Sequence, residues 1–159
     1  MRTKLFPLAL ASVLVLAAGV ATASGRGTQT EKVSCHINLF LQHRPTASAP
    51  GLDFGLVKCS KPFGRGVQYD TFKLMPKTPT NGTAVLTFKA YFDTGTVSGV
   101  WHATYRFTSS TTVLFKQKVT WSRGTGAFKG VRATGTSQGV QRGTRGRIDQ
   151  VLTVTGTVP

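Results

Sequence analysis

Apolar and polar side chains alternate along segment after segment of this chain. Near its start, Val33, Ile37 and Leu39 fall in one phase, whereas Ser34 and His36 fall in the other. Successive side chains of a β-strand point to opposite faces, so a period of two is typical of a strand with one buried face. Beyond residue 23, no apolar pattern with the 3.6-residue period of a helix extends over any length. The sequence therefore predicts an all-β fold.

The alternation predicts about eight strands. They are expected at 30–42, 54–60, 66–75, 83–92, 96–108, 112–122, 131–141 and 147–158, with the weakest pattern in the second and third. Most connections are short and rich in turn residues. A closed barrel leaves no strand edge unpaired, whereas a two-sheet sandwich only shortens its edges. Short loops between successive strands favour a single eight-stranded antiparallel up-and-down barrel, whose interior holds side chains or one small ligand.

The N-terminus has the pattern of a signal peptide. Arg2 and Lys4 precede an apolar run, and a triplet of small residues ends at Ala23. The apolar run is short for a membrane span, and no basic cluster follows it, which argues against a membrane anchor. We expect residues 1–23 to be removed on export to the periplasm or the medium, leaving 24–159 as a single domain.

The chain has two cysteines, Cys35 and Cys59. Because an exported chain meets an oxidising compartment, we expect one disulfide bond between them rather than two free thiols. The bond would close a loop of about 25 residues. The spacing around neither cysteine is typical of a metal site, and the sequence predicts no metal ion and no cofactor.

A glycine-rich segment, Gly124 to Gly130, lies between two of the strand patterns. A P-loop carries Lys and then Ser or Thr after its last glycine, but here Lys129 precedes Gly130. A dinucleotide-binding fingerprint requires a helix after the glycines, and a strand pattern follows instead. The glycines are therefore expected to form a tight turn, with positive φ at Gly124 and Gly126, and Phe128 is expected to plug one end of the barrel.

This segment also carries a resemblance to a known family. Together with Gly135-Thr136, the strand 153–157 and the segment 95–101, it resembles the bacterial members of the allene oxide cyclase and dirigent-like β-barrel group. The resemblance covers roughly residues 84–158 and implies the barrel. The plant cyclase acts on a fatty-acid epoxide inside its barrel, and dirigent proteins steer the coupling of phenoxy radicals. Their cavity residues match no position in this chain, so the resemblance implies a fold and not an activity.

Candidate catalytic groups are few. The histidines (His36, His43 and His102) are scattered, and the five acidic residues are spread along the chain, so we expect neither a base–nucleophile pair nor paired carboxylates. An isomerase or cyclase would need an acid or an amide inside the barrel. Asn38 and Asp149 fall in the outward phase, which argues against that activity. The sequence therefore predicts no catalytic residue, and a binding or structural protein rather than an enzyme.

The chain is strongly basic, with a formal net charge of +15. Arg142, Arg145 and Arg147 lie around the expected connection before the last strand, and Lys116 and Lys118 share the outward phase of another strand. Such a surface could bind sulfated glycans, lipid phosphates or a nucleic-acid backbone, with a steep salt dependence. The alternative is a solvated surface with no partner. Aromatic residues are not interleaved with the arginines, so no sequence-specific nucleic-acid binding is expected.

Three functions therefore stay open. The first is an exported, non-enzymatic barrel that binds an apolar small molecule among inward-facing aromatic side chains. The second is a cationic module that binds polyanions or the cell envelope. The third is an isomerase or cyclase of the allene oxide cyclase type. The sequence leaves the ligand and the oligomeric state undetermined.

Overall fold

The computed structural model describes residues 30–143 and 146–158. The predicted signal peptide and Arg145 lie outside the described residues. The elements are β1 (Thr30–His43), β2 (Gly51–Cys59), β3 (Arg65–Thr78), β4 (Asn81–Phe92), β5 (Gly95–Ser109), β6 (Thr112–Gly124), the short 3-10 turn η1 (Gly126–Phe128), β7 (Arg132–Arg142) and β8 (Arg147–Thr157). In this part of the chain, no helix has the length and apolar character needed to cross a membrane.

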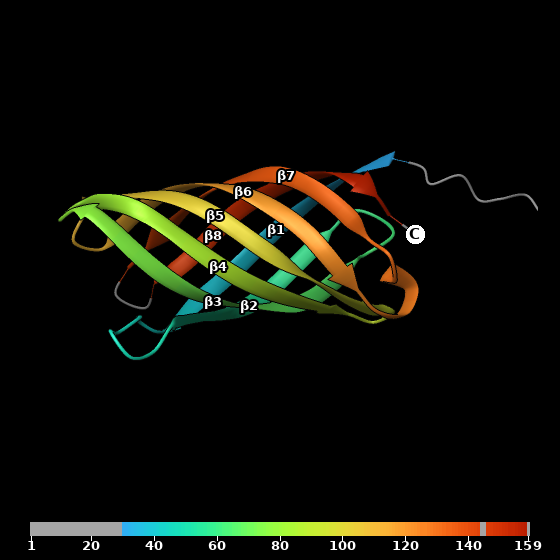
Figure 1. The fold of residues 1–159 in the computed structure, drawn as a ribbon, viewed down its shortest axis with the longest axis horizontal. Coiled ribbons are helices and arrows are strands. Elements are labelled where there is room, and N and C mark those ends of the chain that lie inside the picture. Colours follow the sequence, from blue (N-terminus) through green and yellow to red (C-terminus); the bar gives the residue numbers. More distant parts are fainter. Residues whose placement is uncertain (1–29, 144–145, 159) are drawn as a thin grey trace, which may run out of the picture.

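The eight strands form one closed antiparallel barrel (Figure 1). Each strand pairs with its neighbours in sequence, and β1 pairs with β8 from Thr30 opposite Thr157 to Phe40 opposite Arg147. Closure satisfies the backbone groups that an open sheet would leave at its two edges. The predicted all-β up-and-down barrel is therefore confirmed.

The strand boundaries differ most from the prediction in β2 and β3. β2 begins at Gly51 rather than at residue 54, and β3 ends at Thr78 rather than at residue 75. Aspartate and proline are depleted in strands, so Asp53 and Pro76 obscured these extensions in the sequence. The extension of β2 brings Asp53 into the barrel wall.

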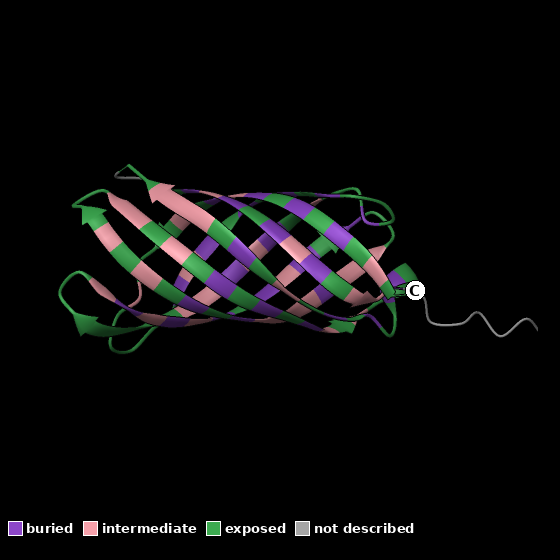
Figure 2. Cartoon of the chain, turned by 90° about the horizontal axis from the view of Figure 1, so that it is seen from above, coloured by how far each residue is buried: buried purple, intermediate pink, exposed green. Residues whose placement is uncertain are grey.

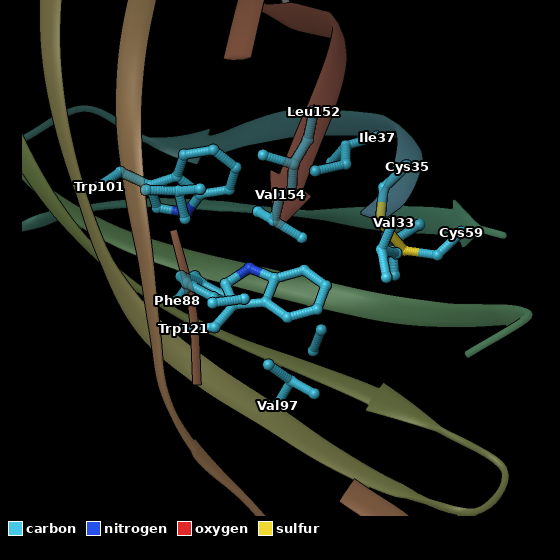
Figure 3. Close-up of a cluster of buried hydrophobic side chains, with 14 of the residues drawn as sticks. Val33, Cys35, Ile37, Cys59, Phe88, Val97, Trp101, Trp121, Leu152 and Val154 are labelled. Atoms are coloured by element: carbon cyan, nitrogen blue, oxygen red, sulfur yellow. A yellow bond between two sulfur atoms is a disulfide. The ribbon is translucent and has the colours of Figure 1, made fainter. Parts of the chain in front are cut away.

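Buried and exposed residues alternate along the strands, as Figure 2 shows. The buried residues form one apolar cluster inside the barrel. Its largest fully buried members include Trp101, Phe128, Ile37, Leu39 and Leu152. Figure 3 shows part of this cluster, with Trp101 and Trp121 inside the barrel and the disulfide bond nearby. The period-two pattern of the sequence thus becomes an inner and an outer surface.

One end of the barrel is filled by aromatic side chains. The ring of Phe128, which is 1% exposed, stacks on Phe63 with 4.4 Å between centroids and meets Phe92 edge-on at 5.6 Å. Phe63 also packs against Trp121, with the centroids 5.1 Å apart. This end lies on the right in Figure 1, where η1 joins β6 to β7. Aromatic packing therefore fills the interior of the barrel around Phe128.

The glycines around η1 have two different functions. Gly126 and Gly130 have φ angles of +59° and +90°, which glycine adopts without strain. The positive φ expected at Gly124 is wrong, because this residue is the last of β6 and its φ is not positive. A Cβ atom at Gly124 would instead collide with the carbonyl oxygen of Phe128. Gly124 is therefore required by the close approach of the chain to itself.

The predicted disulfide bond is confirmed. Cys35 and Cys59 are directly opposite each other in the pairing of β1 with β2, with 3.9 Å between their Cα atoms. Both are buried inside the barrel. A buried disulfide bond fits a protein that folds in an oxidising compartment.

Loss of this bond should lower the stability of the barrel. Replacing both Cys35 and Cys59 by serine removes a constraint on the unfolded chain and is expected to cost about 3 kcal/mol. Urea unfolding of the double variant and of the reduced wild-type protein measures the effect. Equal midpoints for the oxidised protein and the double variant would contradict the prediction.

Candidate functional site

The end of the barrel opposite η1 contains a cavity of about 280 Å³. Its lining extends to the β1–β2 loop, through Arg44 and Pro45, and to the β5–β6 turn, through Ser110 and Thr111. The barrel therefore has one packed end and one hollow end. The hollow end lies on the left in Figure 1.

The cavity wall is mainly apolar. Leu39 of β1, Leu86 of β4 and Ile148 of β8 contribute aliphatic side chains, and Phe72 and Phe115 contribute aromatic rings. These residues are in the inward phase of their strands, as are the buried residues nearer the packed end. Their side chains would surround the apolar part of a ligand on several sides.

Two aspartates interrupt this apolar wall. Asp53 of β2 lies directly opposite Asp70 of β3, and both line the cavity. Asp53 is 4% exposed and Asp70 is 2% exposed. The expectation that the chain has no paired carboxylates is wrong, because the β2–β3 pairing brings together acids that are distant in the sequence.

Burial makes the charged form of both carboxyl groups unfavourable. It raises the pKa of Asp53 to about 7. Burial also raises the pKa of Asp70, to about 8; the nearby Asp53 adds to this rise, and a hydrogen bond from Gln68 opposes it. In that bond, Gln68 Nε2 donates to Asp70 Oδ1 at 2.8 Å. The two acids therefore retain protons at pH values where an ordinary aspartate is fully ionised.

Three residues that line the cavity carry a buried oxygen atom without a hydrogen-bond partner. These oxygens are Oδ1 of Asp53, Oε1 of Gln117 on β6 and Oε1 of Gln150 on β8, none of which is bonded to another described residue. Trp101 Nε1, Trp121 Nε1 and Ser137 Oγ are also unpartnered but belong to residues outside the cavity lining. Buried polar atoms are usually satisfied, so unpartnered oxygens gathered around one cavity indicate a place for a ligand or for water.

The sequence analysis missed all of these polar residues, although a signal was present. Gln117 stands in the phase of Phe115 and Val119, and Gln150 stands in the phase of Ile148. A polar residue in the apolar phase of a strand points into the barrel. Asn38 and Asp149, which the sequence analysis places in the outward phase, do lie in that phase.

The predicted polyanion-binding residues lie on the outside of the barrel. Arg142 is opposite Arg147 at the hollow end, where Arg147 donates to Asp149 Oδ1 at 3.2 Å. Lys116 and Lys118 are exposed on the outer face of β6. The described residues thus place one arginine pair at the rim of the barrel and one lysine pair along its side.

None of the three histidines of the chain is in the cavity lining. His36 and His102 are exposed on the outer face, and His43 is exposed at the end of β1. Within 30–143 and 146–158, no group of three or more His, Cys, Asp or Glu side chains is arranged to hold a metal ion.

Comparison of the chain with protein-family models, with curated proteins and with solved structures found no match. The resemblance to the allene oxide cyclase and dirigent-like group therefore stays a prediction from the sequence motifs. The function has to be argued from the cavity itself.

Proposed function

We propose that this protein binds an apolar small molecule in the hollow end of its barrel, outside the cytoplasm. The observation that carries the proposal is the cavity of about 280 Å³ with aliphatic and aromatic walls. Ligand cavities usually measure about 300–1,000 Å³, so the ligand is small, on the scale of one ring system or a medium alkyl chain. The disulfide bond and the signal-like N-terminus support export.

Narrowing the cavity should weaken binding. Ala103 of β5 lines the cavity, and Ala103→Leu adds three carbon atoms to this position. We expect the mature protein to bind the neutral fluorescent probe prodan with saturation, and the variant to bind it about tenfold more weakly. Fluorescence titration measures both affinities.

The adjacent residue provides a matched control. Thr104 is exposed on the outer face of the same strand, so Thr104→Leu adds apolar volume without entering the barrel. This variant is expected to bind prodan as the wild type does. The absence of saturable binding to the wild type, or an equal loss in both variants, would contradict the proposed function.

An isomerase or cyclase is the second candidate, and one observation favours it. The sequence argues against that activity, because Asn38 and Asp149 fall in the outward phase of their strands. Asp53, Asp70, Gln117 and Gln150 all line the cavity. A carboxyl group that stays protonated near neutral pH is able to donate a proton to a bound molecule. Conversion of a bound ligand into a product of equal mass would distinguish this candidate from simple binding.

The hypothesis of polyanion binding is supported mainly by the net charge of the chain. Arg142, Arg147, Lys116 and Lys118 lie outside the cavity, and Arg147 is already paired with Asp149. Exposed ion pairs and solvated lysines are common on protein surfaces and do not by themselves specify a partner. The cavity therefore supports the first candidate more directly than the surface supports this one.

A further inference from the structure

Three polar side chains around the cavity each have a buried oxygen without a hydrogen-bond partner, and these oxygens indicate which ligand the cavity binds. The three unpartnered atoms of Asp53, Gln117 and Gln150 are all oxygens, and that of Asp53 is an acceptor only once the carboxyl group ionises. They come from β2, β6 and β8, which contribute to different parts of the barrel wall. All three side chains are more than nine-tenths buried. Among the described residues, no hydrogen-bond donor is therefore bonded to these three oxygens.

A buried acceptor without a donor destabilises the folded protein, so an occupant that supplies donors is favoured. Alcohols and amines have such donors. A carboxylate or a phosphate has only acceptors, and the two aspartates would repel its negative charge once they ionise, above about pH 8. Anionic lipids and fatty acids are therefore poor candidates for this cavity.

The cavity also lacks a buried positive charge. Its charged or titratable lining consists of Asp53, Asp70, Tyr105 and Arg44 among the described residues. Arg44 is exposed in the β1–β2 loop, where solvent screens its charge. Burial raises the pKa values of the two aspartates, and no positive charge among the described residues opposes that rise. A cationic group beside them would stabilise their ionised forms, and this attraction is stronger in the barrel interior than the repulsion from solvated surface charges.

We infer that the cavity binds a small amphiphile with a primary ammonium head, held beside the paired carboxyl groups of Asp53 and Asp70, and an apolar tail that contacts the cavity wall. An ammonium group has three N–H donors and no acceptor, so it is able to donate to the unpartnered Oδ1 atom of Asp53. The inference rests on the proposed function and specifies the class of ligand.

Three ligands of equal chain length test the inference: decylamine, decanol and decanoate, each below its critical micelle concentration. Calorimetric titration of the mature protein at about pH 8 should give the highest affinity for decylamine, at least about tenfold above decanol. Decanoate should bind most weakly. An affinity for decanoate that equals or exceeds that for decylamine overturns the inference.

The affinity for decylamine should also depend on pH. The bound ammonium lowers the pKa values of Asp53 and Asp70, so binding releases protons and becomes tighter as the pH rises through about 7 and about 8. Above that range the affinity levels off, because the carboxyl groups are already ionised in the free protein while the amine keeps its charge. Decanol should show no such rise. A pH-independent affinity for decylamine overturns the inference without any substitution in the protein.

Substitution of Asp53 and Asp70 provides a further test of the inference. In Asp53→Asn/Asp70→Asn, the preference for decylamine over decanol should disappear, whereas Asp149→Asn, which changes an acid on the outer surface, should retain it. An unchanged preference in the double variant overturns the inference. If decanol binds and decylamine has no advantage, only the ammonium head is wrong. If none of the three ligands binds, the proposed function fails as well.

Discussion

The protein is expected to lose stability as the pH rises from about 4 to about 8. In the folded state the pKa values of Asp53 and Asp70 are about 7 and about 8, whereas their ordinary value is 3.8. Between these limits the folded protein holds protons that the unfolded chain has released, so raising the pH favours unfolding. One pKa unit corresponds to about 1.4 kcal/mol, and we expect the pair to contribute on the order of a few kcal/mol after its coupling is taken into account.

Urea unfolding at several pH values measures this effect, and Asp53→Asn/Asp70→Asn isolates it. The double variant keeps the shape of both side chains but cannot ionise. Its free energy of unfolding should fall less between about pH 4 and about pH 8 than that of the wild type, and should exceed the wild-type value above about pH 8. Asp149→Asn serves as the control, because Asp149 is on the outer surface and bonded to Arg147. Parallel pH profiles for the wild type and the double variant would show that the two aspartates are not desolvated.

Truncation of Phe128 is expected to have the other large effect. Phe128 is 1% exposed and packs against both Phe63 and Phe92. Phe128→Ala removes these contacts and leaves a void that the closed barrel cannot fill, so we expect a loss of about 3–5 kcal/mol. Urea or thermal unfolding measures the loss.

Phe54→Ala is the matched control for this variant. Phe54 lies on the outer face of β2 and is 47% exposed, so the same truncation there should cost about 1 kcal/mol or less. If the two variants were destabilised equally, the aromatic cluster at the packed end would not be a main source of stability. If Phe128→Ala stays folded, it should still bind prodan, because Phe128 does not line the cavity at the hollow end.

Much of the fold could be predicted from the sequence because its signals are local. Alternation in segments such as 84–92 shows where a strand runs and which of its residues are buried. Short polar turns between such segments favour pairing in sequence order. The errors at β2 and β3 also have a local origin, since Asp53 and Pro76 are residues that strands usually avoid. The candidate site was predicted far less well, because its residues come from several strands.

The sequence by itself determined the number and order of the strands, the inward phase of each, and the two cysteines that form the disulfide bond. Only the tertiary structure decided that Asp53 faces Asp70 and that Gln117 and Gln150 line the same cavity. The physical reason is that the alternation shows the face of a strand but not its register with the next strand. Register is set by packing of the whole barrel, and it decides which buried polar groups meet. The tertiary structure also decided that aromatic rings fill one end of the barrel and leave the other end hollow.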